Sequence, residues 1–329
     1  MAGTINALEL LEYFSGNFRF RCVLMLLEGT KMKTDKSAKM LSVAVVAAAL
    51  FTALFSGAAA AETLFDSNIP PGWTHIGGNT PISGYGSAVA NGNIGLSPDE
   101  GRYGYVTTVG TKFIDNGNGC GSVGLGLGTD KASGCERNGS VLQSSVFTAA
   151  AGDELQFYFN YITSDGQKFS DYAWARLINT VTQEAILLFT ARTTTDENTV
   201  PGSGMPAIGE GVEIVGPGGN PATPMIEGSG QDGGPVWDKL GSDSGFCYGI
   251  FGEGCGYTGW IQANYEFVDD GSYVLEFGVV NWTDNFRDSG LAFDGVTLTR
   301  RPAAVPEPAS LALFGLGLMG LAAFRRRRA

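Results

Sequence analysis

The sequence predicts an all-β chain, folded as an antiparallel β-sandwich of the jelly-roll type. Apolar residues recur with a period of two through the middle of the chain, and helical periodicity is scarce there. Glycine supplies 49 of the 329 residues, about double the usual share, which suits many tight turns. Short strands separated by turn signals are typical of a sandwich, and we expect a single ectodomain of this kind at residues 62–300.

Each strand is predicted from its own run of side chains. Leu155–Tyr161 alternates apolar and polar residues, and Tyr273–Val279 repeats this alternation. Asp171–Asn179 is also predicted as a strand, with larger side chains such as Tyr172 and Trp174 on one face and Ala173, Ala175 and Leu177 on the other. Ala185–Ala191 is a continuous apolar run, which favours a strand buried on both faces, and Leu291–Thr299 closes the domain. Shorter strands are predicted at Thr63–Asp66, Tyr103–Val109, Ser122–Leu127, Val141–Phe147 and Trp260–Phe267.

One long segment, residues 193–235, is rich in glycine and proline and carries only scattered apolar residues. A structureless loop of this length is unusual inside a compact domain. It could be an excursion from the end of the sandwich, a small hairpin subdomain or a linker. We favour the excursion, because the strands that follow are too few for a second sandwich.

The N-terminal part predicts export. Residues 32–61 combine a lysine-rich start, an apolar stretch at Leu41–Phe55, and the small residues Ala59 and Ala61 before a predicted cleavage at Glu62, as in a signal peptide. Because such a signal begins close to its initiator, we interpret residues 1–31 as mis-annotated upstream sequence. A genuine N-terminal extension is the alternative.

The C-terminal part has three successive elements. Val305, Pro306, Glu307 and Pro308 lie in a linker at residues 301–310, a hydrophobic helix is predicted at 311–324, and an arginine-rich tail follows at 325–329. Two prolines keep the linker extended and accessible to an enzyme. The helix would be about 21 Å long, short of the roughly 30 Å hydrocarbon core, and the arginines would stay cytoplasmic. A weak single-pass anchor is the alternative.

This ordered combination resembles the PEP-CTERM sorting signal of Gram-negative bacteria that make extracellular polysaccharide. The resemblance covers residues 305–329. It implies processing by signal peptidase and by an exosortase, which is thought to cut near the Pro-Glu-Pro. It also implies transient tethering to the inner membrane, followed by release to the cell surface or extracellular matrix without a transmembrane helix.

The body is similar to a group of uncharacterised PEP-CTERM surface proteins with a jelly-roll-like ectodomain. The resemblance implies a surface location and a sandwich fold, and it brings no catalytic residues. The segments that carry it are Ala150–Asp153, Thr163–Gly166, Asp171–Leu177, Gly256–Trp260, Leu275–Trp282 and Asp288–Val296.

The predicted mature body is strongly acidic. Residues 62–305 contain 28 acidic and 11 basic side chains, a net charge of −17. Such a surface repels phosphate backbones and anionic lipids, which argues against nucleic-acid binding. It suits a soluble exported protein and favours divalent cations nearby.

Four cysteines remain in this body, an even number that indicates disulfides in an exported chain. Four cysteines permit three connectivities, and we favour the local pairs Cys120–Cys135 and Cys247–Cys255, because each closes a glycine-rich loop. A zinc site is the alternative, but Cys-x-x-Cys spacing is absent and His75, the only histidine, is distant in sequence.

The sequence offers few residues for catalysis, and we predict no catalytic residue and no enzyme activity. Any triad would require His75, which lies in a predicted turn without a nucleophile elbow. Gly124–Gly128 imitates a nucleotide-binding loop but lacks the P-loop lysine. A glycosidase needs only two carboxylates, and no acidic pair stands out.

Two groups of residues suggest ligands. Asp284, Asp288 and Asp294 cluster near the last strands, and oxygen ligands on extracellular loops suit Ca²⁺; turn chemistry explains the same residues. Among the five tryptophans, Trp174 and Trp260 are the favoured platforms for stacking on glycans, although tryptophan is more often a core residue.

Two classes of function follow. We favour a non-enzymatic surface or matrix protein that binds glycans or neighbouring proteins in the exopolysaccharide of a biofilm. The alternative is an extracellular glycan-active hydrolase that uses an acidic pair.

Overall fold

The computed structural model describes the β-rich part of the chain, within a compact unit at residues 58–303. Predictions for residues 1–58 and for the C-terminal sorting segment lie outside the described part, Gly317 excepted. The described residues are 59–76, 83–86, 90–99, 101–166, 168–193, 198–216, 233–248, 254–302 and 317.

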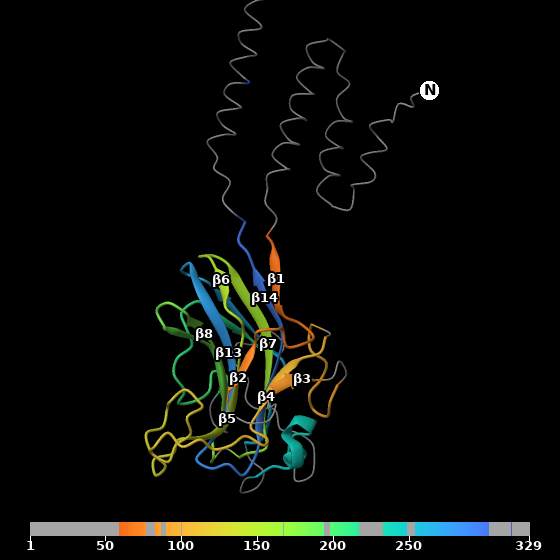
Figure 1. Ribbon diagram of the computed structural model, residues 1–329. Coiled ribbons are helices and arrows are strands. Elements are labelled where there is room, and N and C mark those ends of the chain that lie inside the picture. The colour runs from red at the N-terminus through yellow and green to blue at the C-terminus, as the bar shows by residue number, and fades with distance from the viewer. Residues whose placement is uncertain are drawn as a thin grey trace, which may run out of the picture. The chain divides into compact units, whose positions relative to one another are not determined.

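Two antiparallel sheets form the sandwich (Figure 1), which confirms the predicted fold class. The eight-stranded sheet has the order β10 (Val212–Val215), β12 (Ile261–Glu266), β7 (Glu154–Thr163), β14 (Ser289–Thr299), β4 (Gly104–Thr107) and β3 (Ser83–Tyr85). In addition, β1 (Ala61–Phe65) pairs with β14, and β11 (Gly256–Tyr257) pairs with β7. The six-stranded sheet has the order β2 (Thr74–Ile76), β5 (Glu136–Gln143), β13 (Gly271–Trp282), β8 (Tyr172–Asn179) and β9 (Ala185–Arg192), and β6 (Phe147–Ala149) pairs with β13.

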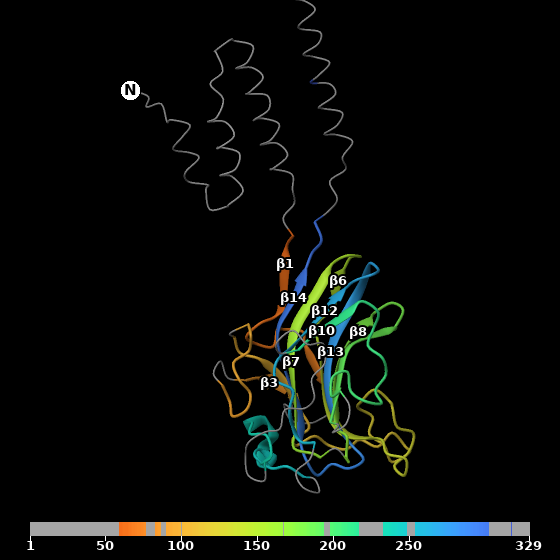
Figure 2. The same cartoon turned by 180° about the vertical axis from the view of Figure 1, so that it is seen from behind.

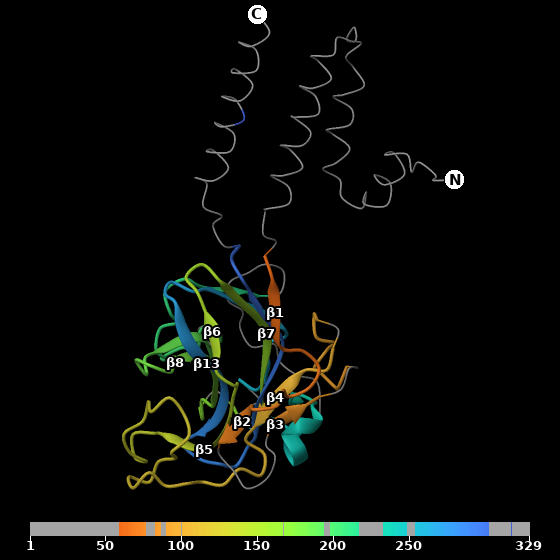
Figure 3. The same ribbon diagram turned by 45° about the horizontal axis from the view of Figure 1, so that its top comes forward.

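The strands of the two sheets lie in two facing layers (Figure 3). Aromatic rings fill the space between these layers. Phe159 of β7 stacks on Phe189 of β9 with the ring centroids 3.7 Å apart, and Phe277 of β13 stacks on Phe293 of β14 at 4.0 Å. These residues occupy the inward positions of their strands, because side chains of a strand alternate between its two faces. The alternation read from the sequence at 155–161 therefore identifies the buried face of β7 correctly.

The predicted strand at Ser122–Leu127 is wrong, although its apolar alternation is real. Val123 is buried, and Leu125 and Leu127 pack beside the cluster that contains Tyr172. Their backbone groups bond to side chains instead of a strand: Leu125 N–H donates to the Tyr172 hydroxyl at 2.8 Å, and Leu127 N–H to Glu136 Oε1 at 2.6 Å. The alternation thus reflects packing of a loop without a partner strand.

Segment 193–235 is not wholly a loop. Val212–Val215 forms β10, which pairs with β12 at the edge of the eight-stranded sheet (Figure 2). Ile214 is buried because it points into the core, while its neighbours Glu213 and Val215 are exposed. Four residues with this alternation suffice to extend the sheet, so this part of the segment belongs to the sandwich.

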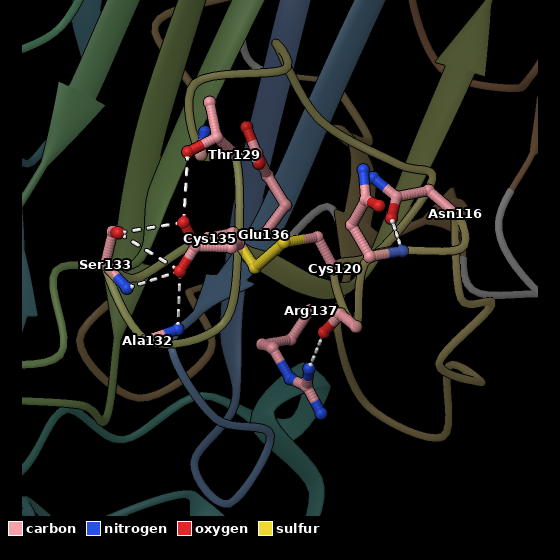
Figure 4. Close-up of a disulfide and its surroundings, with 12 residues drawn as sticks. Asn116, Cys120, Thr129, Ala132, Ser133, Cys135, Glu136 and Arg137 are labelled. Atoms are coloured by element: carbon pink, nitrogen blue, oxygen red, sulfur yellow. Dashed lines mark hydrogen bonds between the residues drawn. A yellow bond between two sulfur atoms is a disulfide. The ribbon is translucent and has the colours of Figure 1, made fainter.

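Both favoured disulfides are confirmed. Cys120–Cys135 and Cys247–Cys255 each join α-carbons 5.7 Å apart. Figure 4 shows the first of these beside Glu136 and Arg137 at the start of β5. Arg137 donates a hydrogen bond to the Gly119 carbonyl, so the bridge and this side chain together hold the long loop that precedes β5.

Candidate functional site

The outer face of the eight-stranded sheet carries a row of side chains that strand register brings together. Asp294 of β14 lies opposite Tyr158 of β7, and Tyr158 lies opposite Gln262 of β12. The next row pairs Gln156 with Asn264. Since Phe157 and Phe159 point into the core, these alternate residues point the other way.

Trp260, which precedes β12, lies next to this row and is half-buried. Its indole Nε1–H donates to the Gly95 carbonyl at 3.1 Å, and its ring meets Tyr103 edge-on with the centroids 5.8 Å apart. These two contacts hold the indole in one orientation while leaving part of it open to solvent. Of the two tryptophans favoured from the sequence, Trp260 keeps an accessible ring.

We call Gln156, Tyr158, Trp260, Gln262 and Asn264 the outer polar face. All five are half-buried, and the Gln262 amide donates to Asn264 Oδ1 at 2.9 Å. Aromatic faces beside oriented carboxamides provide both stacking surfaces and hydrogen-bonding groups, the combination that polar ligands with apolar faces require. Apart from Trp260, none of these residues could be singled out from the sequence, because such side chains on an exposed strand face carry no distinctive signal.

Trp174, by contrast, is a core residue, so its predicted role as a glycan platform is incorrect. Its side chain is 0% exposed, and its Nε1–H donates to Glu276 Oε1 at 2.8 Å. A side chain at Gly278 on the neighbouring strand β13 would collide with the indole. The ring is therefore enclosed between strands and presents no face to a ligand.

The three aspartates proposed for Ca²⁺ do not come together. Asp288 precedes β14, where its Oδ1 accepts from the Thr108 hydroxyl at 2.8 Å. Asp294 lies six residues further along the chain, which in an extended strand corresponds to about 20 Å. Asp294 is grouped instead with Asp66 and Asp99, and one carboxylate oxygen from each lies within 4.8 Å of the others. Closeness in sequence was misleading because residues in an extended strand become far apart in space over only a few positions.

A second set of acidic residues lies where β14 begins. Asp165 and Asp171 are buried there, and Asp171 accepts from Trp282 N–H at 2.8 Å and from the Ser289 hydroxyl at 2.6 Å. Burial, reinforced by the carboxylate of Asp284, raises the pKa of Asp165 to about 7. Burial also raises the pKa of Asp171. These groups join β7, β8, β13 and β14, and the Asp165 carboxyl can hold a proton near neutral pH.

The other predicted site residues lie at the margins of the described part. His75 is exposed on β2, where it pairs with Leu142. Ala59 is exposed, as are Ala61 and Glu62 at the start of β1, and Glu62 forms an ion pair with Arg300 at 2.6 Å. Val305, Pro306, Glu307 and Pro308 lie outside the described residues. Within the described part, no helix has both the length and the apolar character needed to span a bilayer.

Comparison with known proteins identifies the C-terminal segment. Residues 304–328 match the PEP-CTERM protein-sorting motif. No curated protein matches the chain. Among solved structures, the chain is similar to the K1 and K3 cleaved adhesin domains of Lys-gingipain from Porphyromonas gingivalis W83, at 11% identity and TM-scores of 0.33 and 0.34. Each match covers 74% of this chain and 99% or 100% of the adhesin domain, respectively. The chain therefore carries a PEP-CTERM sorting motif, which implies processing by an exosortase, export and sorting to the cell surface.

Proposed function

We propose that this exported protein binds extracellular polysaccharide through the outer polar face and does not cleave it. The observation that carries the proposal is the arrangement of Trp260 and Tyr158 beside the amides of Gln262 and Asn264. Sugar rings have an apolar face that stacks on aromatic rings and hydroxyl groups that pair with amides. The contacts of Trp260 and the Gln262–Asn264 hydrogen bond orient these groups in advance, which lowers the entropy cost of binding.

The charge of the body favours a neutral polysaccharide over an acidic one. Residues 62–305 carry a net charge of −17, so a polyanionic chain would be repelled over most of the surface. Stacking and amide hydrogen bonds need no charge on the ligand. We therefore expect neutral glucans and similar polymers to bind best.

The sorting motif supports the place of action. In this proposal the protein is tethered to the inner membrane for a short time, then cut near Pro306–Pro308 and released into the exopolysaccharide of a biofilm. The intact mass of the protein recovered from cells tests this step. A mass that starts at Glu62 and lacks the arginine tail supports it, and an uncut C-terminus contradicts it.

Binding can be measured by affinity electrophoresis in gels that contain dextran or the exopolysaccharide of the producing cells. Trp260→Ala, and separately the double variant Gln262→Ala with Asn264→Ala, should each weaken retention at least tenfold, roughly 1.4 kcal/mol. Phe286→Ala is the matched control, because Phe286 is 84% exposed in the loop before β14 and lies outside this face. Retention that is unchanged in both test variants would refute the proposal, and thermal melting checks that each variant is folded.

The alternative of a glycan hydrolase is favoured by one observation, the raised pKa of Asp165 near Asp284. A general acid needs such a pKa, but it must also reach its substrate. Asp165 is 2% exposed and Asp171 is 0% exposed, so both are poorly placed to reach a polysaccharide. Release of new reducing ends from the bound polymer, abolished by Asp165→Asn, would support hydrolysis over binding.

A further inference from the structure

Three carboxylates from distant parts of the chain meet beside the outer polar face. Asp66 follows β1, Asp99 lies in the loop before β4, and Asp294 lies within β14. Asp66 and Asp99 are exposed, whereas Asp294 is 0% exposed and lies beneath them. The group therefore has an open side toward solvent and a closed side formed by Asp294.

Asp294 is the unusual member of this group. Both of its carboxylate oxygens are buried, and neither has a hydrogen-bond partner. Ser97 and Gly295 N–H lie close enough to influence the carboxylate, but neither meets hydrogen-bond geometry. A buried carboxylate without a partner is costly, and the nearby charges of Asp99 and Asp66 make it more so. A positive charge at this place would remove the cost.

We propose that Asp66, Asp99 and Asp294 form a Ca²⁺ site. Ca²⁺ binds carboxylate and carbonyl oxygens at about 2.3–2.6 Å, so oxygens on opposite sides of the ion are up to about 5 Å apart. The three oxygens here lie within 4.8 Å of one another. The group contains neither histidine nor cysteine, which disfavours zinc. The space outside the cell supplies calcium at the millimolar level that such open sites need.

Two glycines lie beside the three carboxylates, where a side chain would crowd them. A side chain at Gly101 would begin 3.0 Å from Asp66 Oδ1 and 3.8 Å from the Asp99 carbonyl oxygen. Gly295 lies within a break in the β7–β14 register and has φ +61°, and a side chain there would begin 3.3 Å from Asp99 Cβ. Glycine at these two positions lets both loops approach β14, and the Asp99 carbonyl adds an oxygen near the carboxylates.

The proposed ion joins parts of the domain that are remote in sequence. Phe65 pairs with Val296, so Asp66 leaves β1 next to the bend of β14. Calcium would connect this N-terminal strand and the loop before β4 to the central strand of the sheet. Such an ion would stabilise the sandwich whether or not the outer polar face binds polysaccharide.

The test uses the full chain, purified in mild detergent and freed of metal by a chelator. Calorimetric titration with CaCl₂ should show one ion per chain with a dissociation constant of about 10⁻⁴–10⁻³ M. Tb³⁺ should bind in the same place, with luminescence sensitised by nearby aromatic rings such as Tyr158, 3.1 Å from the side-chain position of Gly295. Calcium should displace Tb³⁺, and Mg²⁺ at the same concentration should not.

Two variants make the result specific. Asp66→Asn with Asp99→Asn changes exposed residues only, so folding should survive while calcium affinity falls at least tenfold. Asp284→Asn is the matched control, since the sequence grouped Asp284 with Asp294 and the structure separates them. Calcium binding that survives the double variant, or that is lost in Asp284→Asn, would overturn the assignment, as would the absence of calcium binding to the unaltered chain.

Discussion

Asp294→Asn removes the buried negative charge and nearly preserves the size of the side chain. Without calcium, burial raises the pKa of Asp294 to about 6 from an ordinary value of 3.8. Ser97 and Gly295 oppose this rise in part, and the charges of Asp99 and Asp66 reinforce it. Each pKa unit corresponds to ~1.36 kcal/mol, so ionisation of Asp294 costs the folded state about 3 kcal/mol at pH 7.5. The buried amide also lacks partners, which costs ~1–2 kcal/mol. In chelator, the variant should therefore be more stable than the parent by about 1–2 kcal/mol.

In calcium, the parent should become more stable than the variant. An ion at 100 times its dissociation constant stabilises the parent by about 2.7 kcal/mol, whereas the variant has lost a ligand and gains much less. The parent should then be more stable than Asp294→Asn by about 1 kcal/mol. For a domain of this size, 1 kcal/mol corresponds to a melting-temperature difference of about 2–4 °C, which is readily measured.

The pH dependence has a defined sign. Because the folded-state pKa of Asp294 is above its unfolded value, the folded state binds the proton more tightly, and stability without calcium falls as the pH rises from about 4 to 7. Asp165 and Asp288, whose pKa values burial also raises, contribute in the same direction and remain in the variant. Thermal melts of parent and variant in chelator and in calcium, at pH 5 and 7.5, test the reasoning. Equal destabilisation by Asp294→Asn in both media would refute it.

Two further predictions concern stability. The Glu276 side chain is 2% exposed and accepts hydrogen bonds from Trp174 and Gln143, each at 2.8 Å. It also lies 2.6 Å from Arg176 Nε, in an ion pair without hydrogen-bond geometry. Glu276→Gln should therefore lower the free energy of unfolding in urea by ~2 kcal/mol, whereas the exposed Glu184→Gln should change it little. Replacing both cysteines of the Cys120–Cys135 disulfide, which are separated by 15 residues, with serine should cost up to about 3 kcal/mol, and an unchanged urea midpoint would contradict a stabilising role for this bridge.

The sequence predicts the sandwich well where burial imposes a simple periodicity. The alternation at 155–161 identifies the core face of β7, because an exposed face and a buried face require different side chains. The loop 122–127 shows the limit of this reasoning: its apolar residues also alternate, but Tyr172 and Glu136 bond to its backbone in place of a strand. The periodicity of apolar residues indicates which side chains are buried. Whether the segment forms a strand depends on a pairing partner elsewhere in the chain, which the periodicity does not reveal.

The group of three aspartates proposed as a calcium site could not be predicted from the sequence, for a related reason. Asp66, Asp99 and Asp294 meet only because β1 pairs with β14 and the loop before β4 folds over the same strand. Sequence proximity favoured Asp284 and Asp288 as partners of Asp294, but the strand carries Asp294 away from them. The disulfides could be predicted because each closes a short loop, so little tertiary information was needed.

The disulfides and the proposed calcium site both suit a protein that works outside the cytoplasm. Disulfides form in oxidising surroundings outside the cytoplasm, and an open calcium site fills only where calcium reaches the millimolar range. The same carboxylates that bind calcium outside destabilise the fold in its absence, since Asp294 is buried without a partner. In this proposal the sandwich is less stable where calcium is scarce, and it gains stability where calcium is available outside the cell.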